Sequence, residues 1–460
     1  MAAERKRGSA EKRKRKEIKV EITKVMTGVS FAPTKIFVKD FGPIKEADTD
    51  LGRVTILMGP NNTGKTYTAV LMLVLEQLLI WWWHIAPVLM TPTQVTLEEV
   101  MRLDEYEQSL DKATVDILLR LYSVNRPEDL VRRGSDKAKL RFVLRPEEEQ
   151  FDDILEIEIQ VDKSGVVTSR FHGFRELLET KKAAPIIAPL IYIPAERAGI
   201  MRTYKQLLRL HIETSWLSAP PHLKRKFTQL MMSERFRLPG VIRVLLDHIL
   251  NTEKFTLEER KKVFVAPALD LLEEEVLRGR LEMGEDLSVM YQETGVEKPI
   301  DLINASSMVS EVSAIYLLSG MLRKGWWLII EEPEAHVHPR GQMGLARFMA
   351  ALARLGVNVI ATTHSDLIAL KLAQMVGLAG LSPEDRVKLG YREDEYLTKE
   401  ELALYFMDPT EGGSVARKIE VSETGEVSDL PTYTNVLEEM YGEAVKLLEL
   451  HGKIPKISEG

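Results

Sequence analysis

Two adjacent glutamates, Glu331 and Glu332, end an apolar run in the stretch WWLIIEEPEAHVHP, residues 326–339. Two carboxylates in a poorly solvated place repel one another and raise each other's pKa. A bound cation offsets this repulsion, because a metal ion is often the largest charge in its site. We therefore expect Glu331 to bind a metal ion and Glu332 to hold or deprotonate a water molecule. The plainer alternative is a strand that ends in two solvated glutamates.

A phosphate-binding loop is predicted far upstream, in GRVTILMGPNNTGKT, where the strand-like VTILM precedes GPNNTGKT. The latter segment fits the pattern G-x-x-x-x-G-K-[ST] between a strand and a helix. Its glycines let backbone N–H groups face an anion, and the helix N-terminus adds its dipole. Lys65 is expected to reach the β- and γ-phosphates of ATP, and the Thr66 hydroxyl to bind Mg²⁺. The residues predicted to bind the nucleotide are Gly59, Pro60, Asn61, Asn62, Thr63, Gly64, Lys65, Thr66 and Tyr67.

Another apolar strand, GVNVIATTHSD, ends at His364. A lone histidine is usually structural, but this strand follows the acidic strand and its helix, where a γ-phosphate sensor would lie. We predict that Lys65, Glu332 and His364 are catalytic. Thr66 and Glu331 are the predicted metal ligands.

A pair of histidines, His336 and His338, follows the glutamates, and His-x-His spacing can ligate a transition metal. The segment after them, PRGQMGLARFMAALARLG, has the apolar spacing of a helix. We therefore favour a turn that leads into a helix over a metal site.

The composition is that of a globular chain of 460 residues with a net charge of −7 and no cysteine. The lack of cysteine fits a reducing, cytoplasmic compartment, and scarce Asn and Gln beside abundant charge is typical of thermophilic proteins. The apolar segment Val70–Met90 contains Glu76 and His84, which favours a buried core helix over a membrane span. Residues 1–19 hold nine Lys or Arg and three Glu, as expected of a solvated tail or of a contact to nucleic acid.

Four segments occur in the order GPNNTGKT, NASSMVSEVSAIYLL, LIIEEPEAHVHP and VIATTHSD. This order resembles that of ABC-type ATPases of the SMC/RecF/OLD group. More narrowly, it resembles stand-alone AAA family ATPases with OLD-like heads, found in anti-phage and toxin–antitoxin-like systems. YIPAERAG also resembles a segment of these proteins, although Arg197 within it suits either a phosphate contact or a structural ion pair. The resemblance covers about residues 33–85, 185–200 and 300–370.

The resemblance implies a Mg²⁺-dependent ATPase with an α/β fold. This is a P-loop NTPase of ABC-ATPase type, with a mixed central sheet, flanking helices, an antiparallel β subdomain and an inserted helical lobe. It also implies a homodimer, or a higher oligomer, in which two protomers enclose ATP. In such dimers a serine at a helix start contacts the γ-phosphate bound by the other protomer. Ser307 matches by position and Ser306 is next, with a plain N-cap as the alternative.

Two departures from the family pattern affect this site. Met308 stands where a glycine is common, and no glutamine loop is evident, since Gln77 and Gln94 are only candidates. The function implied is an ATP-gated dimeric switch that controls a separate DNA-processing or defence effector. A TOPRIM nuclease domain often follows the ATPase in the OLD group, but too few residues follow His364 to form one, so any nuclease would be a separate chain.

Two alternatives remain open: a transporter's nucleotide-binding subunit, which would carry an LSGGQ-like signature, and a non-hydrolysing scaffold. The expected parts of the chain are a basic tail (1–19), an N-terminal ATPase lobe (20–85), an inserted helical and β-hairpin region (86–180), a strand with a helical lobe (181–300), a C-terminal ATPase lobe (301–380) and a small α/β extension (381–460).

Overall fold

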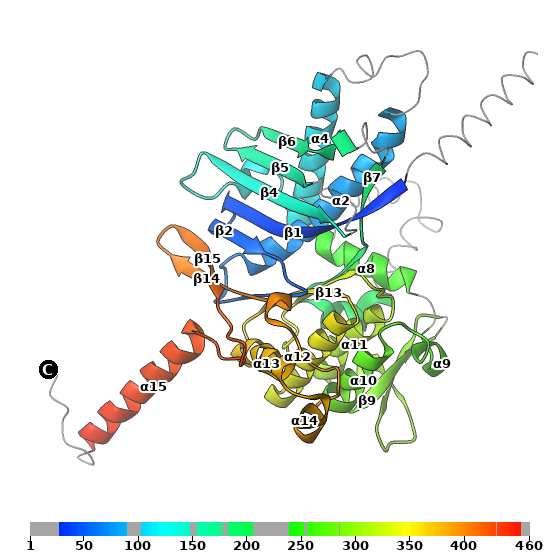
Figure 1. The fold of residues 1–460 in the computed structure, drawn as a ribbon, viewed down its shortest axis with the longest axis vertical. Helices are drawn as coiled ribbons and strands as arrows, with labels where there is room; N and C mark the ends of the chain where they lie inside the picture. Colours follow the sequence, from blue (N-terminus) through cyan, green and yellow to red (C-terminus); the bar gives the residue numbers. More distant parts are fainter. Residues whose placement is uncertain are drawn as a thin grey trace, which may run out of the picture. The chain divides into compact units, whose positions relative to one another are not determined.

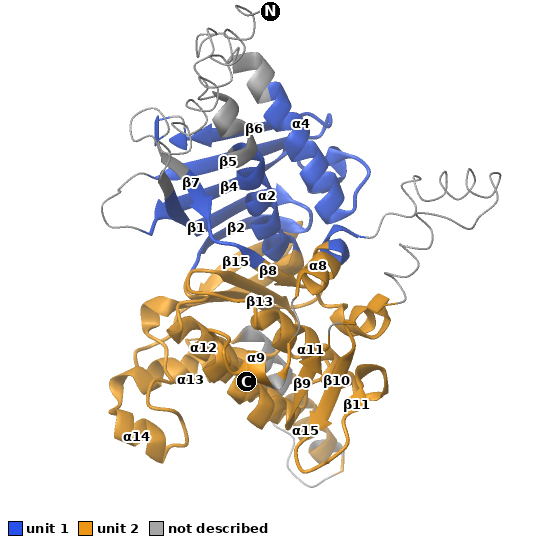
Figure 2. Ribbon diagram, turned by 90° about the vertical axis from the view of Figure 1, so that its right-hand side faces the viewer, with its two compact units in different colours: residues 1–51, 67–190, 238–243 blue, residues 52–66, 191–237, 244–460 orange. Residues whose placement is uncertain are grey.

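The computed structural model describes residues 27–89, 103–147, 154–174, 176–177, 183–205, 239–252, 255–284, 286–428 and 430–451. The chain divides into two compact units, which Figure 2 colours blue and orange. Unit 1 comprises residues 1–51, 67–190 and 238–243, and unit 2 comprises residues 52–66, 191–237 and 244–460. The basic segment 1–19 and Gln94, both named above, lie outside the described residues.

Unit 1 contains an antiparallel run of strands in the order β6-β5-β4-β1-β2, and β7 pairs with β1 in parallel. The strands are β1 (Thr27–Phe41), β2 (Ile44–Asp50), β4 (Lys137–Pro146), β5 (Leu155–Asp162), β6 (Val167–His172) and β7 (Ala183–Ile187). Apolar and polar residues alternate along β4 and β5, and the apolar ones are buried. The hairpin predicted from this alternation is confirmed by the antiparallel pairing of β5 with β6.

Three helical elements accompany these strands: α2 (Lys65–Leu89), α4 (Leu103–Tyr122) and the 3₁₀ turn η1 (Pro127–Leu130). The first two residues of α2 belong to unit 2 and the others to unit 1. Its apolar residues between Ala69 and Leu79 are buried, so the predicted core helix is confirmed there. Among the described helices, none is long and apolar enough to span a bilayer.

Unit 2 contains a mixed run of strands in the order β15-β14-β3-β13-β12-β8, of which Figure 1 labels β13, β14 and β15. Strand β3 pairs in parallel with both β13 and β14, β13 pairs in parallel with β12, and β14 pairs antiparallel with β15. The strands are β3 (Val54–Met58), β8 (Leu190–Ile193), β12 (Trp327–Glu331), β13 (Asn358–Thr363), β14 (Leu402–Thr410) and β15 (Gly413–Ile419). Every residue of β3, β12 and β13 is buried, which explains why these strands are continuous apolar runs.

Helix α12 packs against α13, α10 and the π-helical turn η3 within unit 2 (Figure 1). The helices are α8 (Gly240–Asn251), whose first four residues belong to unit 1, then α9 (Leu257–Arg260), α10 (Ala266–Leu271), η3 (Leu272–Leu277), η4 (Leu302–Asn304), α11 (Ser307–Ser319), α12 (Pro339–Arg354), α13 (Asp366–Gly377), η5 (Leu378–Gly380), α14 (Pro383–Lys388), η6 (Lys399–Glu401) and α15 (Pro431–Leu450).

A second, three-stranded antiparallel sheet lies between η3 and η4 in the sequence. It is made of β9 (Gly279–Met283), β10 (Val289–Glu293) and β11 (Ile300–Asp301). The segment 181–300, predicted to hold a strand and a helical lobe, therefore also contains β9 and β10. The α/β fold class is confirmed, with a mixed sheet in unit 2 and antiparallel strands in unit 1.

Candidate functional site

The loop of residues 59–66 follows β3 and ends at the start of α2. Gly59 and Gly64 have φ values of 139° and 88°, in the region that residues with a Cβ rarely adopt. A Cβ at Gly59 would lie 2.9 Å from the carbonyl oxygen of Met407 in β14. The glycine spacing of the motif therefore meets both a backbone and a steric requirement.

The loop is held by its own hydrogen bonds and by β15. The Thr63 hydroxyl donates to the Pro60 carbonyl at 2.9 Å, and the Ser414 hydroxyl donates to the Thr63 carbonyl at 2.6 Å. Thr63 is buried, whereas Asn61 and Asn62 are exposed. The loop thus has a fixed side that faces β15 and an exposed side that a ligand can reach.

Lys65 is 6% exposed, and its ammonium donates to the carbonyls of Gly59 and Pro60 at 2.9 and 2.7 Å. Burial lowers its pKa to about 8, although the charges of Glu332 and Glu334 act in the opposite direction. The ammonium therefore lies within the loop, where an incoming phosphate would compete with the two carbonyls for it.

Glu331, the last residue of β12, joins the loop to the acidic strand. The Thr66 hydroxyl donates to Glu331 Oε2 at 2.5 Å, and the Tyr192 hydroxyl donates to Glu331 Oε1. Burial raises the pKa of Glu331, while these two hydrogen bonds oppose the rise. A hydroxyl and a carboxylate in direct contact are hard oxygen donors, the type that Mg²⁺ prefers. The two residues therefore fit the predicted metal ligands.

Glu332 and His364 lie together at the ends of neighbouring strands, with 3.6 Å between Glu332 Oε1 and His364 Nε2. The contact with His364 lowers the pKa of Glu332, and the charges of Lys65 and Arg197 act in the same direction. The His364 amide N–H donates to Glu334 Oε1 at 2.6 Å, which fixes the position of His364. The structure thus brings the three predicted catalytic residues and both predicted metal ligands into one part of unit 2.

Glu332 has a φ of 43°, a left-handed conformation that is uncommon for residues other than glycine. Its amide donates to the Thr362 carbonyl at 2.8 Å, and its own carbonyl accepts from the Ala335 amide at 3.0 Å. Such conformations persist only where several contacts of the surrounding structure hold the residue in place.

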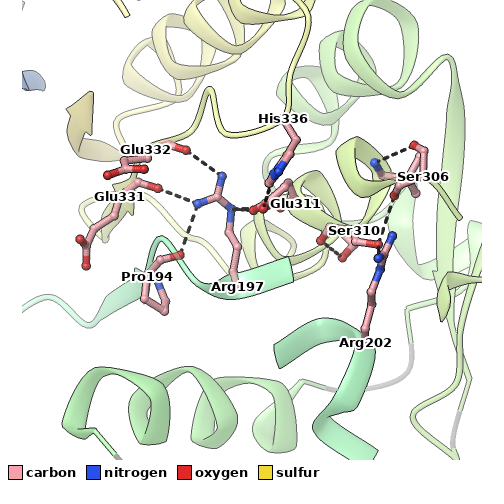
Figure 3. A network of polar contacts seen from close by, with 11 residues as sticks. Pro194, Arg197, Arg202, Ser306, Ser310, Glu311, Glu331, Glu332 and His336 are labelled. Atoms are coloured by element: carbon pink, nitrogen blue, oxygen red, sulfur yellow. Dashed lines mark hydrogen bonds and ion pairs between the residues drawn. The ribbon is translucent and has the colours of Figure 1, made fainter. Parts of the chain in front are cut away.

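Arg197 begins the helical stretch 197–205 and is completely buried. Its guanidinium donates to the carbonyls of Glu331 and Glu332, and its Nε lies 3.2 Å from Glu311 Oε2 in α11 (Figure 3). Of the two roles left open by the sequence, the structure assigns Arg197 to the structural ion pair.

Helix α11 begins at Ser307, and its N-cap is Ser306, whose hydroxyl accepts from the Val309 amide at 3.3 Å. Both serines are exposed. Nearby, Arg202 donates to the Ser310 hydroxyl at 2.9 Å and to the Ala305 carbonyl at 2.9 Å (Figure 3). The capping role thus belongs to Ser306, and the Ser307 hydroxyl lies at the exposed start of the helix.

The histidine pair leads into α12, as the helical spacing predicted. His338 is the N-cap of α12, and His336 Nδ1 lies 3.1 Å from Glu311 Oε1. Across the described part of the chain, no group of three His, Asp or Glu side chains could hold a metal ion by itself.

Two residues from the sequence analysis lie in unit 1. The ring of Tyr67 packs against Phe41 and Tyr122, with centroid distances of 5.7 and 4.9 Å. The amide oxygen of Gln77 accepts a hydrogen bond from Arg120. These contacts lie within unit 1 and leave the predicted nucleotide contact of Tyr67 untested.

Sequence reasoning missed two residues of this site, Tyr192 and Glu311. Tyr192 supplies a hydroxyl within an otherwise apolar strand, and Glu311 supplies a carboxylate within the apolar helix α11. Both are buried. The available signal was that Tyr192 is the one polar residue of β8 and Glu311 the one charged residue of α11, because buried polar groups are usually paired.

The sequence of residues 211–370 matches the family described as "AAA domain, putative AbiEii toxin, Type IV TA system". This match includes Glu331, Glu332 and His364 but not the loop 59–66. Among curated proteins, no relative matches the chain.

Several solved structures of SMC head domains are similar at low identity. The head domain with a coiled coil and joint from Pyrococcus yayanosii matches 89% of this chain and 100% of its own, with 11% identity and a TM-score of 0.45. The head domain from Thermotoga maritima matches 85% of this chain and 99% of its own, with 11% identity and a TM-score of 0.40. These scores mark a loose likeness, and no conclusion rests on them.

The family match and the arrangement of the motifs support the resemblance drawn from the sequence. The residues that carry the resemblance, from the loop 59–66 to Glu331, Glu332 and His364, lie together in unit 2. Residues 211–370 are thus similar to this AAA domain family, over about a third of the chain.

Proposed function

We propose that this chain binds ATP with Mg²⁺ at the loop 59–66 and hydrolyses it. The observation that carries the proposal is the 2.5 Å hydrogen bond from Thr66 to Glu331, two residues that lie 265 positions apart in the sequence. This contact joins a phosphate-binding loop to a strand that ends in two acids. A loop that only bound an anion would not require the second acid, Glu332.

Each residue of the site has a role that follows from its environment. Thr66 and Glu331 would hold Mg²⁺, which when bound would neutralise charge that develops on the phosphates. Lys65 would exchange its two carbonyl partners for phosphate oxygens, which favour the charged ammonium. Glu332 stays ionised beside His364 because its pKa is lowered. Its ionised carboxylate can accept a proton from a water molecule.

The Glu332→Gln variant tests the hydrolysis step. It keeps the size of the side chain and removes the base, so we expect turnover to fall by about 10²–10⁴-fold while ATP still binds. Glu384→Gln on α14, an exposed glutamate outside the site, is the matched control. Turnover of Glu332→Gln at the wild-type rate would show that Glu332 is not the base.

We further propose that ATP closes a homodimer in which Ser307 of one protomer contacts the γ-phosphate bound by the other. The exposure of Ser307 at the start of α11 supports this, because a helix N-terminus favours an anion. Met308 would then lie close to the partner's nucleotide. Light scattering of Glu332→Gln with and without ATP measures the dimer, and a mass that does not change with ATP would contradict the proposal.

The dimer would act as a switch for a separate effector, which the OLD resemblance suggests is a nuclease of TOPRIM type or another defence protein. The type IV toxin–antitoxin system in the description of the matched family supports such a role. Nucleic acid would be bound through the basic residues of segment 1–19. Co-purification with the chain, followed by an ATPase assay with and without DNA, tests both parts. An ATPase rate that changes neither with DNA nor with any co-purifying protein would favour a transporter subunit. Absence of ATP hydrolysis would favour the non-hydrolysing scaffold.

A further inference from the structure

One buried arginine, Arg197, binds the backbone of Glu331 and Glu332 at the end of β12. Arg197 Nη1 donates to the Glu331 carbonyl at 2.6 Å, and Nη2 donates to the Glu332 carbonyl at 2.9 Å (Figure 3). Nη1 also contacts the Pro194 carbonyl at 3.3 Å. The guanidinium thus binds the carbonyls of two successive peptide bonds, the one that links the two glutamates and the next one.

The same guanidinium is paired with α11. Its Nε lies 3.2 Å from Glu311 Oε2 and donates to the Glu311 carbonyl at 3.1 Å. Arg197 is completely buried and Glu311 is 3% exposed, so neither charge is solvated by water. A buried charge without its partner is strongly unfavourable, so each of the two residues depends on the other.

The backbone that Arg197 binds is the part of the site with an unusual conformation. The left-handed φ of Glu332 sets the direction of its side chain toward His364 and separates it from Glu331, whose carboxylate faces Thr66 and Tyr192. Planar guanidinium groups supply several donors in a fixed geometry, which a lysine ammonium does not.

We propose that Arg197 is a positioning residue for the ATP site, which fixes the backbone of Glu331 and Glu332 and takes Glu311 of α11 as its counter-charge. This proposal rests on the proposed ATPase function for its kinetic part only. Arg197 does not touch the reacting atoms. It acts through the two glutamates, and it links the strand that bears them to the helix that begins at Ser307.

Arg197→Lys tests the proposal, because it keeps the charge and removes the forked donors. We expect kcat to fall by roughly 10²-fold, as for a small displacement of catalytic groups, while the Kd for ATP changes by less than about threefold. Glu311→Gln, which keeps the shape of the side chain and removes the counter-charge, should lower kcat in the same direction. Arg260→Lys is the matched control, because Arg260 is 7% exposed and pairs with Asp270 and Glu273, away from the two acids.

Hydrogen exchange of the unliganded protein supplies a readout that does not need turnover. The amides of Glu332 and Ala335 should exchange about tenfold faster in Arg197→Lys and remain as in wild type in Arg260→Lys. Wild-type exchange at both amides in Arg197→Lys would overturn the proposal, as would equal losses of kcat in Arg197→Lys and Arg260→Lys. If the wild type hydrolyses no ATP, the proposed function fails, and the exchange result alone decides the role of Arg197.

Discussion

Replacing Tyr192 by phenylalanine removes one hydroxyl from the centre of the site and should change how the site responds to pH. Tyr192 is completely buried, and its hydroxyl donates to Glu331 Oε1. A hydrogen bond to a charged group contributes about 1.5–3 kcal/mol. Losing this bond should therefore raise the pKa of Glu331 further.

The direction of the pKa change follows from the protonation state of Glu331 that the Tyr192 hydrogen bond stabilises. Burial already raises the pKa of Glu331, and the bonds from Thr66 and Tyr192 favour its ionised form. Without the Tyr192 hydroxyl, Glu331 needs a higher pH to ionise and to bind Mg²⁺. We therefore expect the acid limb of the kcat/KM profile for ATP, measured at limiting Mg²⁺, to move to higher pH. On that limb kcat/KM should fall by about 10–100-fold, the factor that about 1.5–3 kcal/mol represents.

Tyr291→Phe is the matched control for this experiment. The Tyr291 hydroxyl donates to the Leu277 carbonyl at 2.7 Å, and the residue is 7% exposed. Tyr291→Phe therefore removes the hydroxyl of another buried tyrosine without changing a contact of Glu331. An acid limb in Tyr192→Phe that stays at the wild-type position, or that moves equally in Tyr291→Phe, would refute the reasoning.

Three further predictions concern other parts of the molecule. The pKa of Lys65 is lowered to about 8, so Lys65 should take up a proton when ATP binds at about pH 9. Calorimetry in two buffers of different ionisation enthalpy measures this proton uptake, and zero uptake contradicts the prediction. Ser307→Arg in the Glu332→Gln background should abolish the ATP-dependent dimer in light scattering, with ATP affinity changed by about twofold at most. Arg347→Met leaves Glu395, whose side chain is 1% exposed, without its partner; the free energy of unfolding in urea should fall by about 3–5 kcal/mol, and an unchanged value contradicts the ion pair.

The sequence predicted the parts of the site that local spacing determines. The loop 59–66, the acids at the end of β12 and His364 at the end of β13 are each carried by one short motif at a strand end. Parallel strands bring such ends to one edge of a sheet, so their meeting followed from the fold class. Their chemical roles stay predictions.

The contacts that support these residues were not readable from the sequence. Arg197 and Glu331 are 134 positions apart, and Tyr192 and Glu331 are 139 apart, so their contacts depend on which strands become neighbours. The strand β9 was missed for a different reason. Its five residues, GRLEM, are too few for a strand period to be told from a helical one.

The hydrogen bond from Ser414 to Thr63 has a consequence for synthesis of the chain. The two residues are 351 positions apart, and β14 pairs directly with β3, the strand that leads into the loop. At about 5–20 residues per second, a ribosome needs roughly 20–70 s to travel from one to the other. During that time the nascent chain lacks the strands that support the loop, so ATP should become a ligand only when translation of β15 is complete.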